Sequence, residues 1–163
     1  IVDEQNKAIN SGMRKEIHDK ELRHRSVHIF VLTKKGDLIL QKRSWLKDRF
    51  PSVWDSSASG HVDSGESYEK AALRELEEEL GIREEHTELV GTLPASADNG
   101  MEFVELRLCP TPQKVGRITF PPAEVEAIQA FAPEEITKWL DRRPQDFAPG
   151  FAECFALWKK SQK

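Results

Sequence analysis

The stretch that decides the fold runs from Gly60 to Ile82 and reads G-H-V-D-S-G-E-S-Y-E-K-A-A-L-R-E-L-E-E-E-L-G-I. It begins with a glycine-rich loop and continues as a helical pattern, with Ser67 as the expected N-cap and Gly81 at the expected C-terminus. Apolar residues recur at helical spacing and predict a buried stripe of Leu73, Leu76 and Leu80. The sequence therefore predicts a loop followed by a helix packed against the body of the protein.

Three carboxylates share one face of this helix, because Glu75, Glu78 and Glu79 stand at i, i+3 and i+4. Like charges at this spacing repel one another, so the face is either solvated or neutralised by a divalent cation. Magnesium prefers carboxylate oxygens and often bridges them to substrate phosphates. Runs of charge are usually just solvated, so the surrounding positions must decide between the two.

The stretch resembles the Nudix box: Gly, five residues, Glu, seven residues, Arg-Glu, an aliphatic, any residue, Glu-Glu, any residue, Gly, an aliphatic. The matching residues are Gly60, Glu66, Arg74, Glu75, Leu76, Glu78, Glu79, Gly81 and Ile82. The resemblance implies an α+β Nudix fold, a mixed sheet sandwiched between helices. It also implies Mg²⁺-dependent hydrolysis, with Mn²⁺ as an alternative ion, of a diphosphate linked to another group. The implied metal ligands are Glu75, Glu78, Glu79 and the carbonyl of Gly60.

The implied mechanism gives these residues distinct roles. Mg²⁺ held by the glutamates would bridge the phosphates and position a water, and a carboxylate would accept its proton as general base. Arg74 is expected to orient the glutamates by a salt bridge; the alternative is a surface pair with Glu77 or Glu78. The base remains open among Glu79, Glu102, Glu105 and Glu124.

Composition sets the broad class. A chain of 163 residues suits one domain, and we expect a single Nudix domain over residues 1–163. The net charge is −4, and the segment Glu66 to Glu88 alone carries nine Glu against three basic residues. The acidity is therefore local, and a nucleic-acid polymer is not an expected partner. With no membrane span or signal peptide in evidence, we expect a cytoplasmic enzyme, and a homodimer is a common solution for this fold.

The two cysteines, Cys109 and Cys154, lie far apart without metal-binding spacing and are expected to be reduced core thiols. Hydrophobic periodicity predicts strands at 24–33, 38–42, 54–59, 87–93, 102–108 and 126–131. It predicts further helices at 13–18, 133–140 and 151–160.

The segments that precede the box sharpen the resemblance. Q-K-R-S from Gln41, F-P-S-V-W from Phe50 and S-G-H from Ser59 look like the isopentenyl diphosphate isomerase branch of the superfamily. In that branch an Arg and a Lys of this loop bind the substrate diphosphate, and they fall on Arg43 and Lys47. Both types suit phosphate oxygens, although solvent-facing roles are the plain alternative. Glu102 is a further expected residue of the substrate site.

Departures from the isomerases decide the reaction. Ser59 stands where they place a catalytic Cys, and a hydroxyl is a far poorer acid than a thiol, whose pKa is about 8.5. The isomerases also typically have a degraded box. Histidines of their metal site would fall on His24 and His61, with His18 one residue out of step. We favour a local hydrogen-bonding role for His61 and a metal-free strand position for His24.

The sequence thus predicts a Mg²⁺-dependent pyrophosphohydrolase that cleaves the diphosphate linkage of a nucleoside di- or triphosphate or a nucleoside diphosphate derivative. The alternatives are a prenyl diphosphate isomerase and a non-catalytic nucleotide-sensing module. The partner is a small-molecule diphosphate, and the sequence does not name its leaving group. Aromatic residues that could stack on a base are Trp45, Phe50, Phe103, Phe120 and Trp139.

Overall fold

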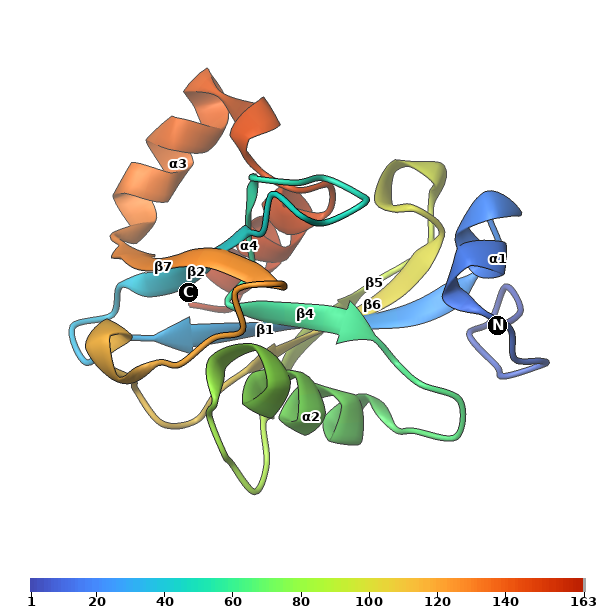
Figure 1. The fold of residues 1–163 in the computed structure, drawn as a ribbon. Coiled ribbons are helices and arrows are strands. Elements are labelled where there is room, and N and C mark those ends of the chain that lie inside the picture. Colours follow the sequence, from blue (N-terminus) through green and yellow to red (C-terminus); the bar gives the residue numbers. More distant parts are fainter. Residues whose placement is uncertain (163) are drawn as a thin grey trace.

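A computed structural model describes residues 1–162 and shows a mixed sheet covered by helices on both faces (Figure 1). The strands are β1 (His24–Leu32), β2 (Leu38–Arg43), β3 (Trp54–Asp55), β4 (Ala58–His61), β5 (Glu88–Leu93), β6 (Glu102–Leu108) and β7 (Val125–Phe131). The α-helices are α1 (Arg14–Asp19), α2 (Tyr68–Leu80), α3 (Pro133–Arg142) and α4 (Phe151–Ser161). Short 3₁₀ turns are η1 (Ala97–Asn99), η2 (Val115–Arg117) and η3 (Pro144–Asp146). The α+β class expected from the sequence is confirmed.

Strand β1 is the centre of the sheet, as its apolar run predicts. The hydrogen-bonded path is β3-β2-β1-β6-β5, with β4 also pairing with β1 and β7 with β2. Strands β1 and β6 run parallel, and the other pairings are antiparallel. β1 is buried along nearly its whole length, which fits a strand rich in Val, Ile and Phe.

The sheet opens into a cleft because β1 changes partner along its length. Near Val31 and Leu32 it pairs with β2, whereas its segment 26–29 pairs with β4. The single strand expected at 54–59 is therefore wrong: β3 pairs with β2, and β4 pairs with β1. Ser57 marks the crossing, since its hydroxyl donates to the Ile39 carbonyl and accepts from the Val31 amide at 2.8 Å.

Two apolar clusters hold the layers together. Below the sheet in Figure 1, α2 packs Leu76 and Leu80 against the β1 residues Val27 and Ile29. Above it, α3 and α4 cover the other face, where Phe30 of β1 packs with α4. Fully burying a side chain of this size contributes about 1.5–3 kcal/mol. Leu73 is only half buried, and the fully buried positions beside Leu76 are Ala71 and Ala72.

Helix α2 begins and ends where its sequence predicts. The Ser67 hydroxyl accepts a hydrogen bond from the Lys70 amide at 3.1 Å, which satisfies a free N–H of the first turn. Gly81 ends the helix at φ 67°, in the left-handed region that favours glycine. A Cβ at this position would also meet Thr119 Oγ1 at 2.3 Å. These local signals fix the rotation of α2 and hence the direction of its carboxylates.

Cys109 and Cys154 are both free and buried, as predicted. Within residues 1–162, none of the helices combines the length and the apolar character that a bilayer span requires.

Candidate active site

A cavity of about 540 Å³ occupies the cleft between the diverging strands. Its walls come from β1, β4, α1, α2, residues 43–50 and residues 97–100. This volume suits a small organic ligand. The site residues expected from the sequence that line it are Arg43, Lys47, Gly60, Arg74, Glu75, Glu78, Glu79 and Glu102.

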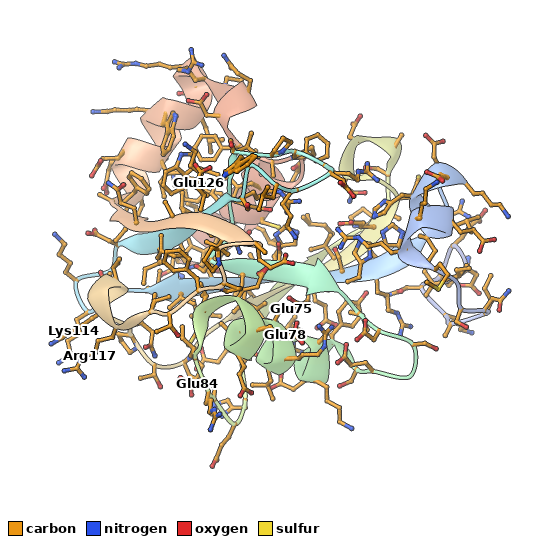
Figure 2. All side chains as sticks on the ribbon, viewed as in Figure 1. Glu75, Glu78, Glu84, Lys114, Arg117 and Glu126 are labelled. Atoms are coloured by element: carbon orange, nitrogen blue, oxygen red, sulfur yellow. The ribbon has the colours of Figure 1, made fainter. Side chains whose placement is uncertain are left out.

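Helix α2 supplies an acidic wall. Figure 2 shows Glu75 and Glu78 on the side of α2 that lies toward β4. Glu75 and Glu79 are each only 8% exposed, whereas Glu78 is exposed. Glu79 Oε1 accepts hydrogen bonds from the Ser59 amide at 2.9 Å and from Gln41 Nε2 at 3.0 Å. These two donors fix Glu79 against the β4 backbone.

Arg74 ties the acidic wall to the loop before it. Its Nε and Nη2 donate to the two oxygens of Glu66, each at 2.9 Å, in a bidentate pair. Its Nη1 donates to Glu75 at 2.7 Å and to Glu78 at 3.3 Å, and Nη2 also donates to the His61 carbonyl at 3.0 Å. Glu77 pairs with Arg83 instead. Arg74 therefore positions Glu75, the arrangement favoured from the sequence.

Gly60 leaves the space that Glu75 occupies. A Cβ at residue 60 would lie 2.3 Å from Glu75 Oε1 and 2.4 Å from its Cδ. Any side chain here would displace the carboxylate. The glycine is thus required by the close approach of a side chain to the β4 backbone.

Two carboxyl groups in this wall have unusual proton affinities. Burial raises the pKa of Glu79 to about 8, and the nearby Glu75 carboxylate adds to the effect. Burial also raises the pKa of Glu75 to about 7, although Arg74 acts in the opposite direction. The protein's own cations therefore leave the negative charge of the wall incompletely compensated.

Basic side chains from outside α2 also line the cavity. Arg43 donates from Nε to the Phe50 carbonyl at 3.0 Å and from Nη2 to the Arg49 carbonyl at 2.9 Å, which orders residues 43–50. Lys47 pairs with Glu124. Arg14 of α1 and Arg49 also line the cavity, and neither makes a side-chain hydrogen bond or salt bridge within residues 1–162. Sequence reasoning missed both of these arginines.

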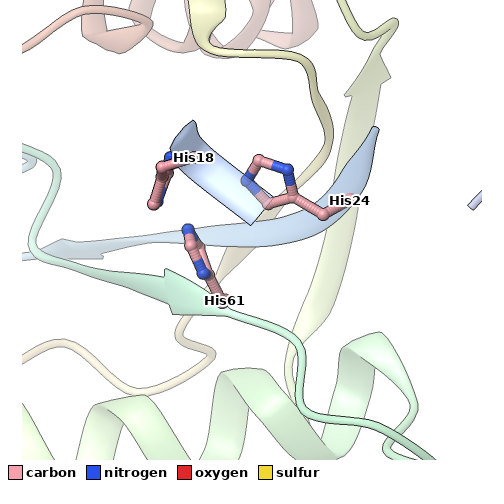
Figure 3. Close-up of side chains that lie close together, drawn as sticks. All are labelled: His18, His24 and His61. Carbon is pink, nitrogen blue, oxygen red and sulfur yellow. The ribbon is translucent and has the colours of Figure 1, made fainter. Parts of the chain in front are cut away.

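Three imidazoles lie close together beside the cavity, and two of them, His18 and His61, line it (Figure 3). One ligand nitrogen from each of His18, His24 and His61 lies within 4.8 Å of the others. Glu102 Oε1 is 3.4 Å from His24 Nε2 and from His61 Nε2. Burial acts to raise the pKa of Glu102, but these two imidazoles outweigh it and hold the pKa well below its usual range. The resemblance placed His24 and His61, with His18 one residue out of step, at a metal site, whereas the roles favoured from the sequence for His24 and His61 were metal-free.

The fold brings the histidines together by strand register. The β1–β6 pairing sets Glu102 opposite His24, and the β1–β4 pairing sets His61 opposite Ser26. Burial, with contributions from His61 and Arg49, lowers the pKa of His18 to about 4. A neutral imidazole keeps a lone pair free, so His18 is available as a metal ligand at neutral pH.

Two further pocket residues, His28 and Asp55, were not among the expected site residues. The sequence did carry a hint of His28, because this titratable residue stands between the apolar Val27 and Ile29 of a predicted strand. Glu105, one of the four candidate bases, pairs with Arg107 and is not among the cavity-lining residues. Among the aromatic candidates, Phe50 is the one that lines the cavity.

Comparison with known proteins identifies the family. The NUDIX domain model matches residues 22–153. The chain belongs to the Nudix family. An uncharacterized Nudix hydrolase of Yersinia pestis is 34% identical over 164 residues, covering 97% of this chain and 83% of the relative. One of Clostridium acetobutylicum is also 34% identical, over 161 residues, with 93% and 78% covered. These relatives support Nudix hydrolase activity.

Solved structures agree on the fold. A crystal structure from Deinococcus radiodurans has a TM-score of 0.80 at 23% identity, covering 99% of this chain and 97% of that one. The NUDIX domain of Shewanella oneidensis NrtR, complexed with ADP ribose, has a TM-score of 0.68 at 14% identity, with 93% and 100% covered. Nudix hydrolases generally use divalent metal ions. The donor set fits such an ion, because the partly uncompensated carboxylates of Glu75 and Glu79 are oxygen ligands.

Proposed function

We propose that this Nudix hydrolase cleaves the phosphoric anhydride bond of a nucleoside di- or triphosphate or of a nucleoside diphosphate derivative, with Mg²⁺ as its ion. The observation that carries the proposal is one cavity lined both by three glutamates of α2 and by basic side chains from outside that helix. A site that binds a diphosphate uses both kinds of side chain. Carboxylates hold the metal ions that accompany the diphosphate, and basic side chains bind its free oxygens.

Glu75, Glu78, Glu79 and the Gly60 carbonyl would hold the ion, with Mn²⁺ as an alternative. When bound, such an ion neutralises charge that develops on the phosphoryl group and lowers the pKa of a bound water. Arg74 keeps the Glu75 carboxylate in place through its 2.7 Å hydrogen bond.

Arg43 and Lys47 bind the substrate diphosphate in this proposal. Lys47 shares its charge with Glu124, so a phosphate oxygen can replace or join that carboxylate. Arg43 has two nitrogens committed to backbone carbonyls, and its Nη1, which lies 3.9 Å from Asp55 Oδ2, makes no hydrogen bond and can donate to a phosphate oxygen. The general base remains to be chosen among Glu79, Glu102 and Glu124, which line the cavity.

The test is phosphate release, after a coupling phosphatase where needed, from a substrate panel with Mg²⁺, Mn²⁺ or EDTA. The panel contains nucleoside di- and triphosphates, nucleotide sugars, dinucleoside polyphosphates, coenzyme A, NADH and isopentenyl diphosphate. We expect one class to turn over only with a divalent ion. Turnover that persists in EDTA, or no turnover by folded protein, contradicts the proposal.

The histidine cluster favours a second candidate, isomerisation of a short prenyl diphosphate. His18, His24, His61 and Glu102 together offer nitrogen and oxygen donors suited to Zn²⁺ or Mn²⁺. Ser59 opposes this candidate, since a serine is a poor proton donor where the isomerases have a thiol. Detection of an allylic product from isopentenyl diphosphate decides between the two reactions. Loss of Zn²⁺ or Mn²⁺ binding in His24→Gln tests the cluster independently of either reaction.

A further inference from the structure

The innermost part of the active-site cavity carries a buried polar pair, His28 from β1 and Asp55 from β3. Both line the cavity, yet they are only 7% and 4% exposed. Ser56 joins them: its hydroxyl lies 2.7 Å from His28 Nδ1, and its amide donates to Asp55 Oδ1 at 2.7 Å. His28 Nδ1 and Asp55 Oδ1 are 3.9 Å apart. The two arms of the cleft thus meet at a polar end rather than an apolar one.

One carboxylate oxygen of Asp55 is free to accept a hydrogen bond from a ligand. Asp55 Oδ1 accepts the Ser56 amide, whereas Oδ2 accepts no hydrogen bond from residues 1–162. Its nearest cation is Arg43 Nη1 at 3.9 Å, beyond hydrogen-bond distance. Because Asp55 lines the cavity, a bound molecule can supply a donor to this oxygen.

The chemistry of this oxygen restricts what binds there. A carboxylate accepts N–H and O–H donors and repels phosphate oxygens, which instead suit Lys47 and the neighbouring Arg43. The diphosphate would then lie next to Asp55, and the group attached to it would reach the carboxylate. A prenyl chain offers no donor, and it would displace water from Asp55 Oδ2 without replacing its hydrogen bonds. A nucleoside offers base N–H groups and ribose hydroxyls. The polar end therefore matches the organic part of a nucleotide.

We infer that Asp55, held in place by the Ser56 amide, is a specificity-determining residue that accepts a hydrogen bond from an N–H or O–H donor on the nucleoside part of the substrate. The inference rests on the proposed function and deepens it, because it says where in the cavity the nucleoside part of the substrate binds. His28 acts through Ser56, whose hydroxyl lies 2.7 Å from His28 Nδ1, and is a positioning residue. Phe50, which also lines the cavity, is available to stack on the base.

The experiment measures binding without turnover. Calorimetric dissociation constants are determined in Mg²⁺ for the α,β-methylene analogues of ADP, CDP, GDP and UDP, and for methylenediphosphonate, which lacks a nucleoside. In Asp55→Asn we expect at least one nucleotide analogue to bind about tenfold more weakly or worse, while methylenediphosphonate binds as it does to the unmodified protein. His28→Gln should shift the same analogue in the same direction by a smaller factor.

Asp98→Asn is the matched control, because Asp98 is an exposed aspartate that lines the same cavity. Losing a negative charge there should change the affinities of nucleotide and methylenediphosphonate by a common factor. The comparison of two ligands on one preparation separates a local contact from general loss of folded protein, and circular dichroism checks the fold of each variant.

Three results overturn the inference: equal weakening of nucleotide and methylenediphosphonate in Asp55→Asn, no weakening of either, or no nucleotide binding to the unmodified protein. The outcomes also separate the two proposals. Nucleotide binding that depends on Asp55 without any hydrolysis removes the proposed function alone. Hydrolysis of nucleotides that is indifferent to Asp55→Asn removes this inference alone.

Discussion

Replacing Gly60 by alanine should disable the site by a clash with one identified group. The new Cβ would stand 2.3 Å from Glu75 Oε1, 2.4 Å from Cδ and 2.9 Å from Oε2. Ordinary non-bonded contacts lie near about 3.5 Å, so the carboxylate must move by about 1 Å or more. Gly60 is not among the glycines with positive φ, so alanine adds no backbone strain of its own.

The displacement has two calculable costs. It breaks the 2.7 Å hydrogen bond from Arg74 to a largely buried carboxylate, which corresponds to about 1.5–3 kcal/mol of stability. It also misplaces a proposed metal ligand, and a 1 Å error of this kind costs about a hundredfold in rate. We therefore expect Gly60→Ala to fold, to lose that stability in urea denaturation, and to lose about a hundredfold in kcat on the best substrate.

Two variants isolate the clash. Gly116→Ala is the control, because nothing lies within 4 Å of its added Cβ and its backbone requires no glycine; it should behave as the unmodified protein. In Gly60→Ala/Glu75→Ala the clash is absent, so alanine at residue 60 should cost little further stability in that background, while activity stays low. A full stability loss on the Glu75→Ala background, or near-normal kcat in Gly60→Ala, refutes the reasoning.

Three more predictions use single interactions. Arg74→Lys loses the bidentate pair with Glu66 and should destabilise the protein by about 2–4 kcal/mol. Arg83→Lys alters only the exposed pair with Glu77 and should change the free energy of unfolding by less than about 0.5 kcal/mol. Similar urea midpoints for the two variants contradict this prediction. The Glu79 pKa of about 8 exceeds the ordinary 4.5. Between pH 4.5 and about pH 8 the folded protein therefore holds a proton on Glu79 that the unfolded chain has lost, and stability falls as the pH rises through this range. In EDTA the Tm should therefore drop more steeply between about pH 5 and pH 8 than in Glu79→Gln, and parallel curves speak against it. Ser67→Ala removes the cap of α2 and should cost about 1 kcal/mol, which an unchanged thermal midpoint would disprove.

The parts of the structure that sequence predicted well are those set by neighbours in the chain. The start of α2 at Ser67, its end at Gly81 and the common face of Glu75, Glu78 and Glu79 follow from helical spacing and capping. Most strand positions followed from apolar runs for the same reason. Such features need no knowledge of which strands pair.

The parts that sequence could not predict depend on pairing between distant segments. The run 54–59 divides because Ser57 bonds to two different strands, and nothing in its composition shows that. The resemblance named the three histidines, but spacing alone could not show that α1 brings His18 to His24 and His61 or that β4 pairs with β1. Asp55 meets His28 across two arms of the sheet, so neither residue alone indicated a site.

The most direct test of the account compares Glu78→Gln with Glu77→Gln. Both side chains lie on α2 and are more than half exposed, at 58% and 54%, but Glu78 lines the cavity and Glu77 pairs with Arg83. If the acidic wall binds the catalytic ion, Glu78→Gln should lower kcat on the best substrate by about a hundredfold or more, while Glu77→Gln keeps normal turnover. Equal activity in the two variants would contradict the proposal that these glutamates perform the hydrolysis.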